Sequence, residues 1–95
     1  MLILATKLKN ALPAHYAVTL RNVSVNGKKI GCTGFVQYAG RTVYINTERG
    51  CGFQYMARTA AHSKDYTGGR NHFADNLELL VALVNTLIVT THIPT

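Results

Sequence analysis

The sequence contains few acidic residues and few cysteines, and each shortage excludes a class of protein. Four of the 95 residues are Asp or Glu. Two of these, Asp75 and Glu78, are expected to cap a helix, so catalysis by a pair of carboxylates is not expected. The cysteines, Cys32 and Cys51, are too few for a zinc signature and too sparse for a secreted disulfide scaffold, which favours a reducing, intracellular setting. The chain also lacks a Gly-x-Ser-x-Gly elbow, a Walker loop and a His-Glu-x-x-His pattern.

Long apolar runs are missing as well. The apolar N-terminus is interrupted early by Lys7, so it is shorter than the core of a secretory signal, and no signal peptide is expected. The apolar stretch 77–89 contains Glu78 and Asn85. It falls short of the roughly 20 residues that cross a bilayer. We therefore expect a helix of a soluble protein at this position and no membrane partner.

The chain does contain enough apolar sequence for one folded domain, together with an excess of positive charge. Hydrophobic residues make up 47% of the 95 residues and charged residues 15%. This balance predicts a single folded domain over residues 1–95 and argues against disorder. Ten Lys and Arg against four Asp and Glu give a net charge of +6, which favours phosphate-rich or acidic partners.

The first half of the chain predicts a helix followed by three antiparallel strands, over residues 2–11, 16–25, 28–38 and 41–47. Apolar residues at helical spacing indicate the helix, which Pro13 ends. Alternation with a period of two indicates the first strand, with a one-residue slip near Asn22. Asn26-Gly27 is a strong signal for a tight hairpin turn, and Ala39-Gly40 marks a second one.

A two-residue turn at Ala39-Gly40 would fix the register of the second hairpin and separate two faces of the sheet. The expected pairs are Tyr38 with Arg41, Val36 with Val43 and Gly34 with Ile45, and the apolar face containing Val36, Val43, Ile45 and Ile30 should pack against helices. Phe35 and Tyr44 then lie on the opposite face. Two interpretations of this ring pair stay open: exposed rings that stack bases, or a pair that stiffens the hairpin or is covered by a loop.

The second half predicts a long loop and a closing helix. Residues 53–58 suit either a short fourth strand or a helical turn. Residues 59–74 are expected to form a loop, and Asp75 is expected to cap a helix whose apolar surface is wide. The predicted fold is therefore α+β: an N-terminal helix, an antiparallel meander of three or four strands, a long loop, and a C-terminal helix packed on one sheet face. The wide apolar surface also predicts a homodimer through this helix.

The long loop is the expected binding site. Cationic, aromatic and imidazole side chains surround a Gly-Gly pair there, and convergent backbone amides beside an Arg can hold a phosphate or a carboxylate. The alternative is a solvated loop whose glycines only supply positive φ angles. Two lysines that follow the first hairpin turn add to the expected basic surface. The candidate residues for binding nucleic acid or a partner are Arg58, Lys64, Tyr66, Gly68, Gly69, Arg70, His72, Lys28 and Lys29.

Two further chemistries use the same segment. His62 or His72 beside Arg and Lys side chains suits a metal-independent nuclease, with His as acid or base and a cation at the transition state. A metal ion on His62, His72 and Asp65 is not expected, because the spacing fits no standard ligand set. We expect no catalytic residue, no metal and no cofactor in this chain.

Part of the chain resembles a known group of proteins. Residues 55–84, YMARTAAHSKDYTGGRNHFADNLELLVALV, with the preceding strand TVYINTE, resemble a pattern in small α+β proteins encoded by bacteriophages. The shared features are Arg58-Thr59-Ala60, the Lys-Asp-Tyr-Thr-Gly-Gly segment, an Asn and the closing helix, and they cover about half of the chain. The resemblance implies a protein that acts in the host cytoplasm, either by redirecting host machinery or by binding nucleic acid. It assigns no role to a residue.

These observations favour a small, basic, non-enzymatic protein that binds nucleic acid through its basic loop. A second hypothesis is a phage inhibitor that contacts a host protein or a nucleic-acid-guided defence complex, in the manner of anti-CRISPR proteins. Tyr66, Phe73 and the loop cations would then make the contact, since Tyr and Arg are frequent at the centres of interfaces. The nuclease is a third hypothesis.

Overall fold

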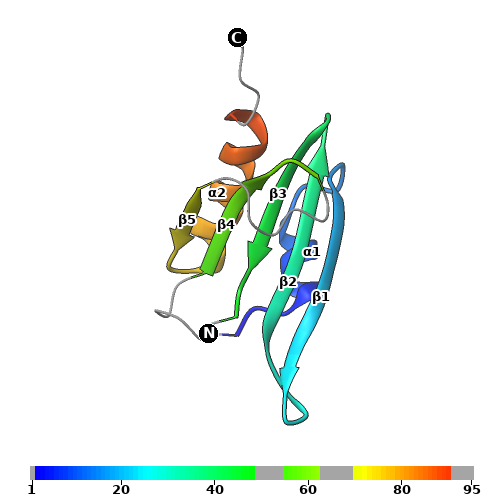
Figure 1. The fold of residues 1–95 in the computed structure, drawn as a ribbon, viewed down its shortest axis with the longest axis vertical. Coiled ribbons are helices and arrows are strands. Elements are labelled where there is room, and N and C mark those ends of the chain that lie inside the picture. The colour runs from blue at the N-terminus through cyan, green and yellow to red at the C-terminus, as the bar shows by residue number, and fades with distance from the viewer. Residues whose placement is uncertain (1, 49–54, 63–69, 91–95) are drawn as a thin grey trace.

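The computed structural model describes residues 2–48, 55–62 and 70–90 and confirms the α+β class (Figure 1). An N-terminal helix precedes five strands, and a longer helix follows them. In chain order the elements are α1 (Ala5–Ala11), β1 (Ala17–Val25), β2 (Lys28–Tyr38), β3 (Arg41–Asn46), β4 (Tyr55–Ala60), β5 (Asn71–Ala74) and α2 (Leu77–Thr90).

The strands form one antiparallel sheet in the order β1-β2-β3-β4-β5. The predicted register of the second hairpin is confirmed: Tyr38 lies opposite Arg41, and Val36 opposite Val43. Of the two interpretations of residues 53–58, the strand is correct, because β4 covers Tyr55–Ala60. A fifth strand replaces the end of the expected loop. β5 has only four residues, which is too short for alternation to reveal it in the sequence.

Both hairpin turns adopt the same backbone conformation. Asn26 and Gly27 have φ angles of 53° and 78°, and Ala39 and Gly40 have φ angles of 53° and 79°. Positive φ at both central residues is the signature of a type I′ turn. The predicted slip in β1 is present between Val23 and Ser24, next to its expected place.

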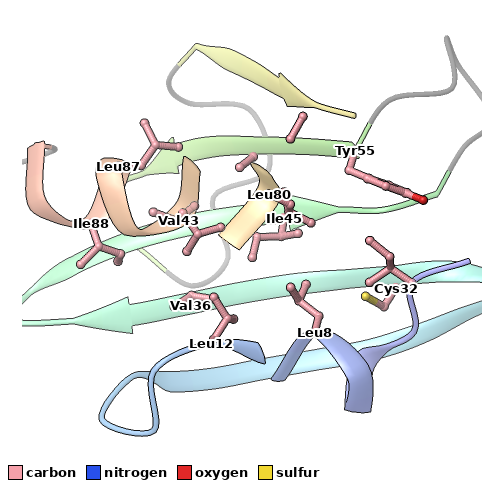
Figure 2. Close-up of a cluster of buried hydrophobic side chains, with 14 residues drawn as sticks. Leu8, Leu12, Cys32, Val36, Val43, Ile45, Tyr55, Leu80, Leu87 and Ile88 are labelled. Carbon is pink, nitrogen blue, oxygen red and sulfur yellow. The ribbon is translucent and has the colours of Figure 1, made fainter. Parts of the chain in front are cut away.

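Both helices pack on one face of the sheet, which we call the helix-covered face (Figure 1). α1 lies against β1 and β2, while α2 lies against β3, β4 and β5. Figure 2 shows apolar side chains from both helices and from the sheet meeting between these layers. The labelled members of this core are Leu8, Leu12, Cys32, Val36, Val43, Ile45, Tyr55, Leu80, Leu87 and Ile88.

The cap of α2 lies one residue later than predicted. The amide of Leu79 donates to Asn76 Oδ1 at 2.9 Å, so Asn76 is the N-cap of the helix. Asn and Asp both cap helices well, and the choice between neighbours depends on where the chain leaves the sheet. β5 ends at Ala74, and Asp75 and Asn76 connect it to the helix.

A buried hydroxyl joins the N-terminal segment to the sheet. Thr47 Oγ1 donates to the carbonyl oxygen of Ile3 and accepts from the amide of Cys32, both at 2.8 Å. The Cys32 thiol is fully buried. Burial raises its pKa, and the neighbouring Thr47 hydroxyl acts in the opposite direction. A thiol held neutral and away from solvent is a packing group and not a nucleophile.

Candidate functional site

The sheet has two ends with different contents. The β2–β3 turn, the first residue of β1, the last residues of β4 and the first residue of β5 lie at one end, which we call the β2–β3 end. The β1–β2 turn lies at the other end, which we call the β1–β2 end. Figure 1 shows the two turns at opposite ends of the long axis, with the β2–β3 turn at the top. β2 has 11 residues, so roughly 35 Å separate its ends.

A depression of about 540 Å³ occupies the β2–β3 end. It is formed by the residues that precede β1, by the β2–β3 turn with its flanking strands, and by the residues that follow β4. Its lining residues are His15, Ala17, Gln37, Tyr38, Ala39, Gly40, Arg41, Thr42, Ala61 and His62. Polar and cationic side chains therefore outnumber apolar ones, and none of the lining residues is acidic.

One row of the sheet runs through this depression, on the face opposite the helices. Ala17, Gln37 and Thr42 lie side by side in β1, β2 and β3. Gln37 Nε2 donates to Thr42 Oγ1 at 3.3 Å, which fixes the amide across the hairpin. The small side chain of Ala17 leaves room at the edge strand. This row supplies amide and hydroxyl groups that can bind a polar ligand.

Three aromatic side chains form a cluster beside the depression. The ring centroids of His15 and Tyr38 are 4.6 Å apart at 70°, and the centroids of His15 and Tyr16 are 4.8 Å apart at 76°. Both are edge-to-face contacts of the favourable kind. The Tyr16 hydroxyl donates to Asn85 Oδ1 at 2.8 Å, which anchors the cluster on α2. Burial, with Tyr38 contributing, raises the pKa of Tyr16, so this hydroxyl keeps its proton at neutral pH.

Arg41 contributes the charge of the β2–β3 turn. It is half-buried and lines the depression. Its Nε is enclosed, yet no residue in the described part of the chain accepts a hydrogen bond from it. A buried donor without an acceptor costs about 1–3 kcal/mol. Such a group needs a reason, and an acceptor supplied by a ligand is one.

The described carboxylates lie away from this end. Glu48 follows β3 and Asp75 follows β5, both where these strands reach the β1–β2 end, and Glu78 is in the first turn of α2. Arg41 and Arg70 lie at the β2–β3 end. Lys28 and Lys29 also lie at the β1–β2 end, so cations occur at both ends of the sheet. At the β2–β3 end, the described part of the chain places no carboxylate near Arg41 and Arg70, which favours anions at the depression.

A second row of the face opposite the helices carries the ring pair. Phe35 and Tyr44 are 5% and 9% exposed, and their centroids are 5.3 Å apart. The guanidinium of Arg58 lies 4.8 Å from the centre of the Tyr44 ring, and Arg58 Nη1 donates to Asn71 Oδ1 at 3.3 Å. The interpretation of these rings as an exposed stacking surface is therefore wrong, since both are buried.

The expected site residues do not form one group. Lys28 and Lys29 are exposed at the β1–β2 end, far from Arg58 and Arg70. His72 lies opposite the buried Ala57, on the helix-covered face, because neighbouring strand residues point to opposite faces. His72 and Arg58 therefore lie on opposite faces of the sheet. Four expected residues lie outside the described residues: Lys64, Tyr66, Gly68 and Gly69.

Three residues of the depression did not stand out in the sequence: His15, Tyr38 and Arg41. The predicted register already placed Tyr38 opposite Arg41 at a tight turn. The sequence signal that could have identified this site is therefore an aromatic residue and an Arg on either side of a tight turn whose first central residue is Ala. An Ala at positive φ is unfavourable, and such positions concentrate at functional sites.

No family model, curated protein or solved structure matches the chain. Within residues 2–48, 55–62 and 70–90, no helix has the length and apolar character needed to cross a membrane.

The helix α2 has two exposed apolar residues: Leu79 is 51% exposed and Val89 is 68% exposed. The homodimer through this helix stays a prediction.

Proposed function

We propose that this protein binds nucleic acid through the β2–β3 end of its sheet. The observation that carries the proposal is the depression beside Arg41, which gathers a guanidinium, two imidazoles, a tyrosine and an amide, with no carboxylate among the described residues that line it. Nucleic acid offers the matching groups, since each nucleotide combines a phosphate with a flat base. The net charge of +6 extends the attraction beyond this end.

The sheet supports binding more than catalysis. Arg58 is held over Tyr44 and by Asn71, so its charge is fixed on the surface of the fold. His62 and His72 are the acid–base candidates of a nuclease. His62 follows β4, whereas His72 lies within β5 on the helix-covered face. A general acid or base must lie within hydrogen-bond reach of the proton that it transfers, so two histidines that act on one substrate must border one site. We therefore place the protein among binding proteins, with phage origin and host cytoplasm as further parts of the proposal.

The test is a titration of labelled single-stranded DNA, single-stranded RNA and duplex DNA with the full chain, followed by fluorescence anisotropy. Binding is expected at 50 mM salt and should weaken by about tenfold or more at 200 mM salt, because several phosphates release counterions. The labelled strands should stay intact in chelator. No binding to any of the three at low salt would overturn the proposal.

The alternative partner is a host protein complex. A pull-down from nuclease-treated bacterial lysate separates the two possibilities, because nucleic acid can no longer bridge the bait to other proteins. Loss of all captured proteins after nuclease treatment is the expected result. Retention of one discrete protein, together with no binding in the anisotropy titration, would favour the inhibitor.

A further inference from the structure

We propose that the depression at the β2–β3 end holds one unpaired nucleotide of a strand, with its phosphate on Arg41 and its base against the Tyr38 and His15 rings. This inference rests on the proposed function and makes it narrower. It commits the protein to single-stranded over double-stranded nucleic acid. It also says which residues contact the phosphate and which contact the base, whereas the net charge predicts only a general attraction to nucleic acid.

The first step is the role of Arg41. Its Nε is buried with no acceptor among the described residues, while the side chain lines the depression. The edge of a guanidinium that carries Nε and one Nη is the edge that binds two oxygens of a phosphate at once. Because this Nε is enclosed, a phosphate in the depression would satisfy the orphan donor after the Arg41 side chain turns outward. Neutral ligands would satisfy it less well, because hydrogen bonds between charged groups are stronger.

The second step is the role of the rings. Tyr38 is 43% exposed, although its ring already contacts His15 at 4.6 Å and Tyr16 at 5.5 Å. Those two contacts and the hydrogen bond from Tyr16 to Asn85 support the ring from the side of α2. A supported ring with exposed surface is a stacking platform for a base. Such stacking is tolerant of sequence, since every base has a flat face.

The third step is the exclusion of duplex. The depression, at about 540 Å³, falls in the range of roughly 300–1,000 Å³ typical of small-molecule sites. It is open toward solvent and is bordered by the turn residues Ala39 and Gly40, by His15 and by His62. A base can lie flat against the Tyr38 ring in this depression only when it is splayed out of its stack, which single strands and loops permit and paired duplex does not.

The experiment compares four variants with the wild-type protein on a labelled oligothymidylate and on a duplex of equal length. Arg41→Gln and Tyr38→Ala should each weaken binding of the single strand by about tenfold. Tyr38→Phe keeps the ring and should stay within about twofold of wild type. Lys28→Gln removes the same charge as Arg41→Gln, but at the other end of the sheet, and should also stay within about twofold.

Circular-dichroism melting of each variant ensures that a loss of binding is not a loss of folding, and the comparison of Arg41→Gln with Lys28→Gln decides the inference if Tyr38→Ala does not fold. Wild-type protein should bind the duplex about tenfold more weakly than the single strand. Equal affinity for duplex and single strand would overturn the inference. So would Arg41→Gln behaving like Lys28→Gln.

The outcomes separate this inference from the proposed function. Binding of nucleic acid that is insensitive to Arg41 and Tyr38 contradicts only the nucleotide site. An absence of binding to every nucleic acid contradicts both. Thymidine monophosphate is the remaining probe: displacement of the labelled strand at equal concentration would identify a free nucleotide as the ligand and overturn the assignment to a strand.

Discussion

The two hairpin turns at the ends of β2 have the same backbone but different surroundings. Asn26-Gly27 and Ala39-Gly40 share nearly identical φ angles. Asn is well suited to its positive φ, whereas Ala is not. The first turn is followed by the exposed Lys28 and Lys29, and the second adjoins a depression, an aromatic cluster and the enclosed Nε of Arg41.

This difference indicates which of the two turns uses residues other than the most stable ones for a type I′ turn. A turn built only for folding uses Asn-Gly, as the β1–β2 turn does. The β2–β3 turn instead combines an Ala at positive φ with a buried donor that lacks an acceptor among the described residues. Residues that break local rules without a folding benefit are expected at functional sites. The two turns therefore support the assignment of binding to one end of the sheet.

The largest effect is expected midway between the turns, at Gly34. A Cβ added there would lie 2.9 Å from the Cα of Leu20 and would overlap the carbonyl oxygen of Thr19, at a φ of +155°. Gly34→Ala should lower the free energy of unfolding by about 3 kcal/mol, because β1 and β2 must move apart. Urea denaturation measures this loss.

The matched control is Gly27→Ala. Gly27 has a φ of +78°, but no atom of the described residues lies within 4 Å of an added Cβ. Only the backbone strain of about 1–2 kcal/mol remains in that variant. Equal losses at Gly34 and Gly27 would mean that the close contact between β1 and β2 is not a constraint on this sheet.

An exchange of residues between the turns should have opposite effects on stability. Ala39→Asn gives the β2–β3 turn the favoured residue and should raise the free energy of unfolding by about 0.5–1 kcal/mol. Asn26→Ala should lower it by a similar amount. Chemical denaturation of both single variants and of the double variant tests this, and the double variant should return close to wild type. Destabilisation by Ala39→Asn would show that Ala39 is required by packing and that the two turns are not equivalent.

Much of this fold could be predicted from the sequence, because local signals and tertiary packing agree in the first two hairpins. Turn residues with positive φ fixed the register of β2 and β3, and alternation then assigned Val36 and Val43 to the core. β5 could not be predicted, since four residues carry no period. The cap at Asn76 was missed for a similar reason, because two adjacent residues were equally suitable.

The site was harder to predict because it depends on which strand ends meet. Arg58 and Tyr44 are far apart in the chain, and the pairing of β3 with β4 brings them together. The sequence gives no direct sign that His15 and His62, which precede β1 and follow β4, line one depression. Net charge predicts attraction to phosphate but not its location, so Lys28 and Lys29 were grouped with residues at the other end.

The smallest effect is expected at these two lysines. Replacement of both by Gln should weaken nucleic-acid binding by less than about threefold at physiological salt, because an exposed lysine contributes mainly through its general field. The change is measured by the anisotropy titration used for wild type. A loss of tenfold or more would move the binding surface to the β1–β2 end and remove the distinction between the two turns.

The most direct test of the account is to locate the bound strand by NMR. Amide shifts of labelled protein would be recorded during titration with an oligothymidylate. The account predicts that the largest changes fall on His15, on residues 37–42 and on residues 61–62, with little change at residues 25–29. Changes centred on residues 25–29 or on α2, with the β2–β3 turn unaffected, would contradict it.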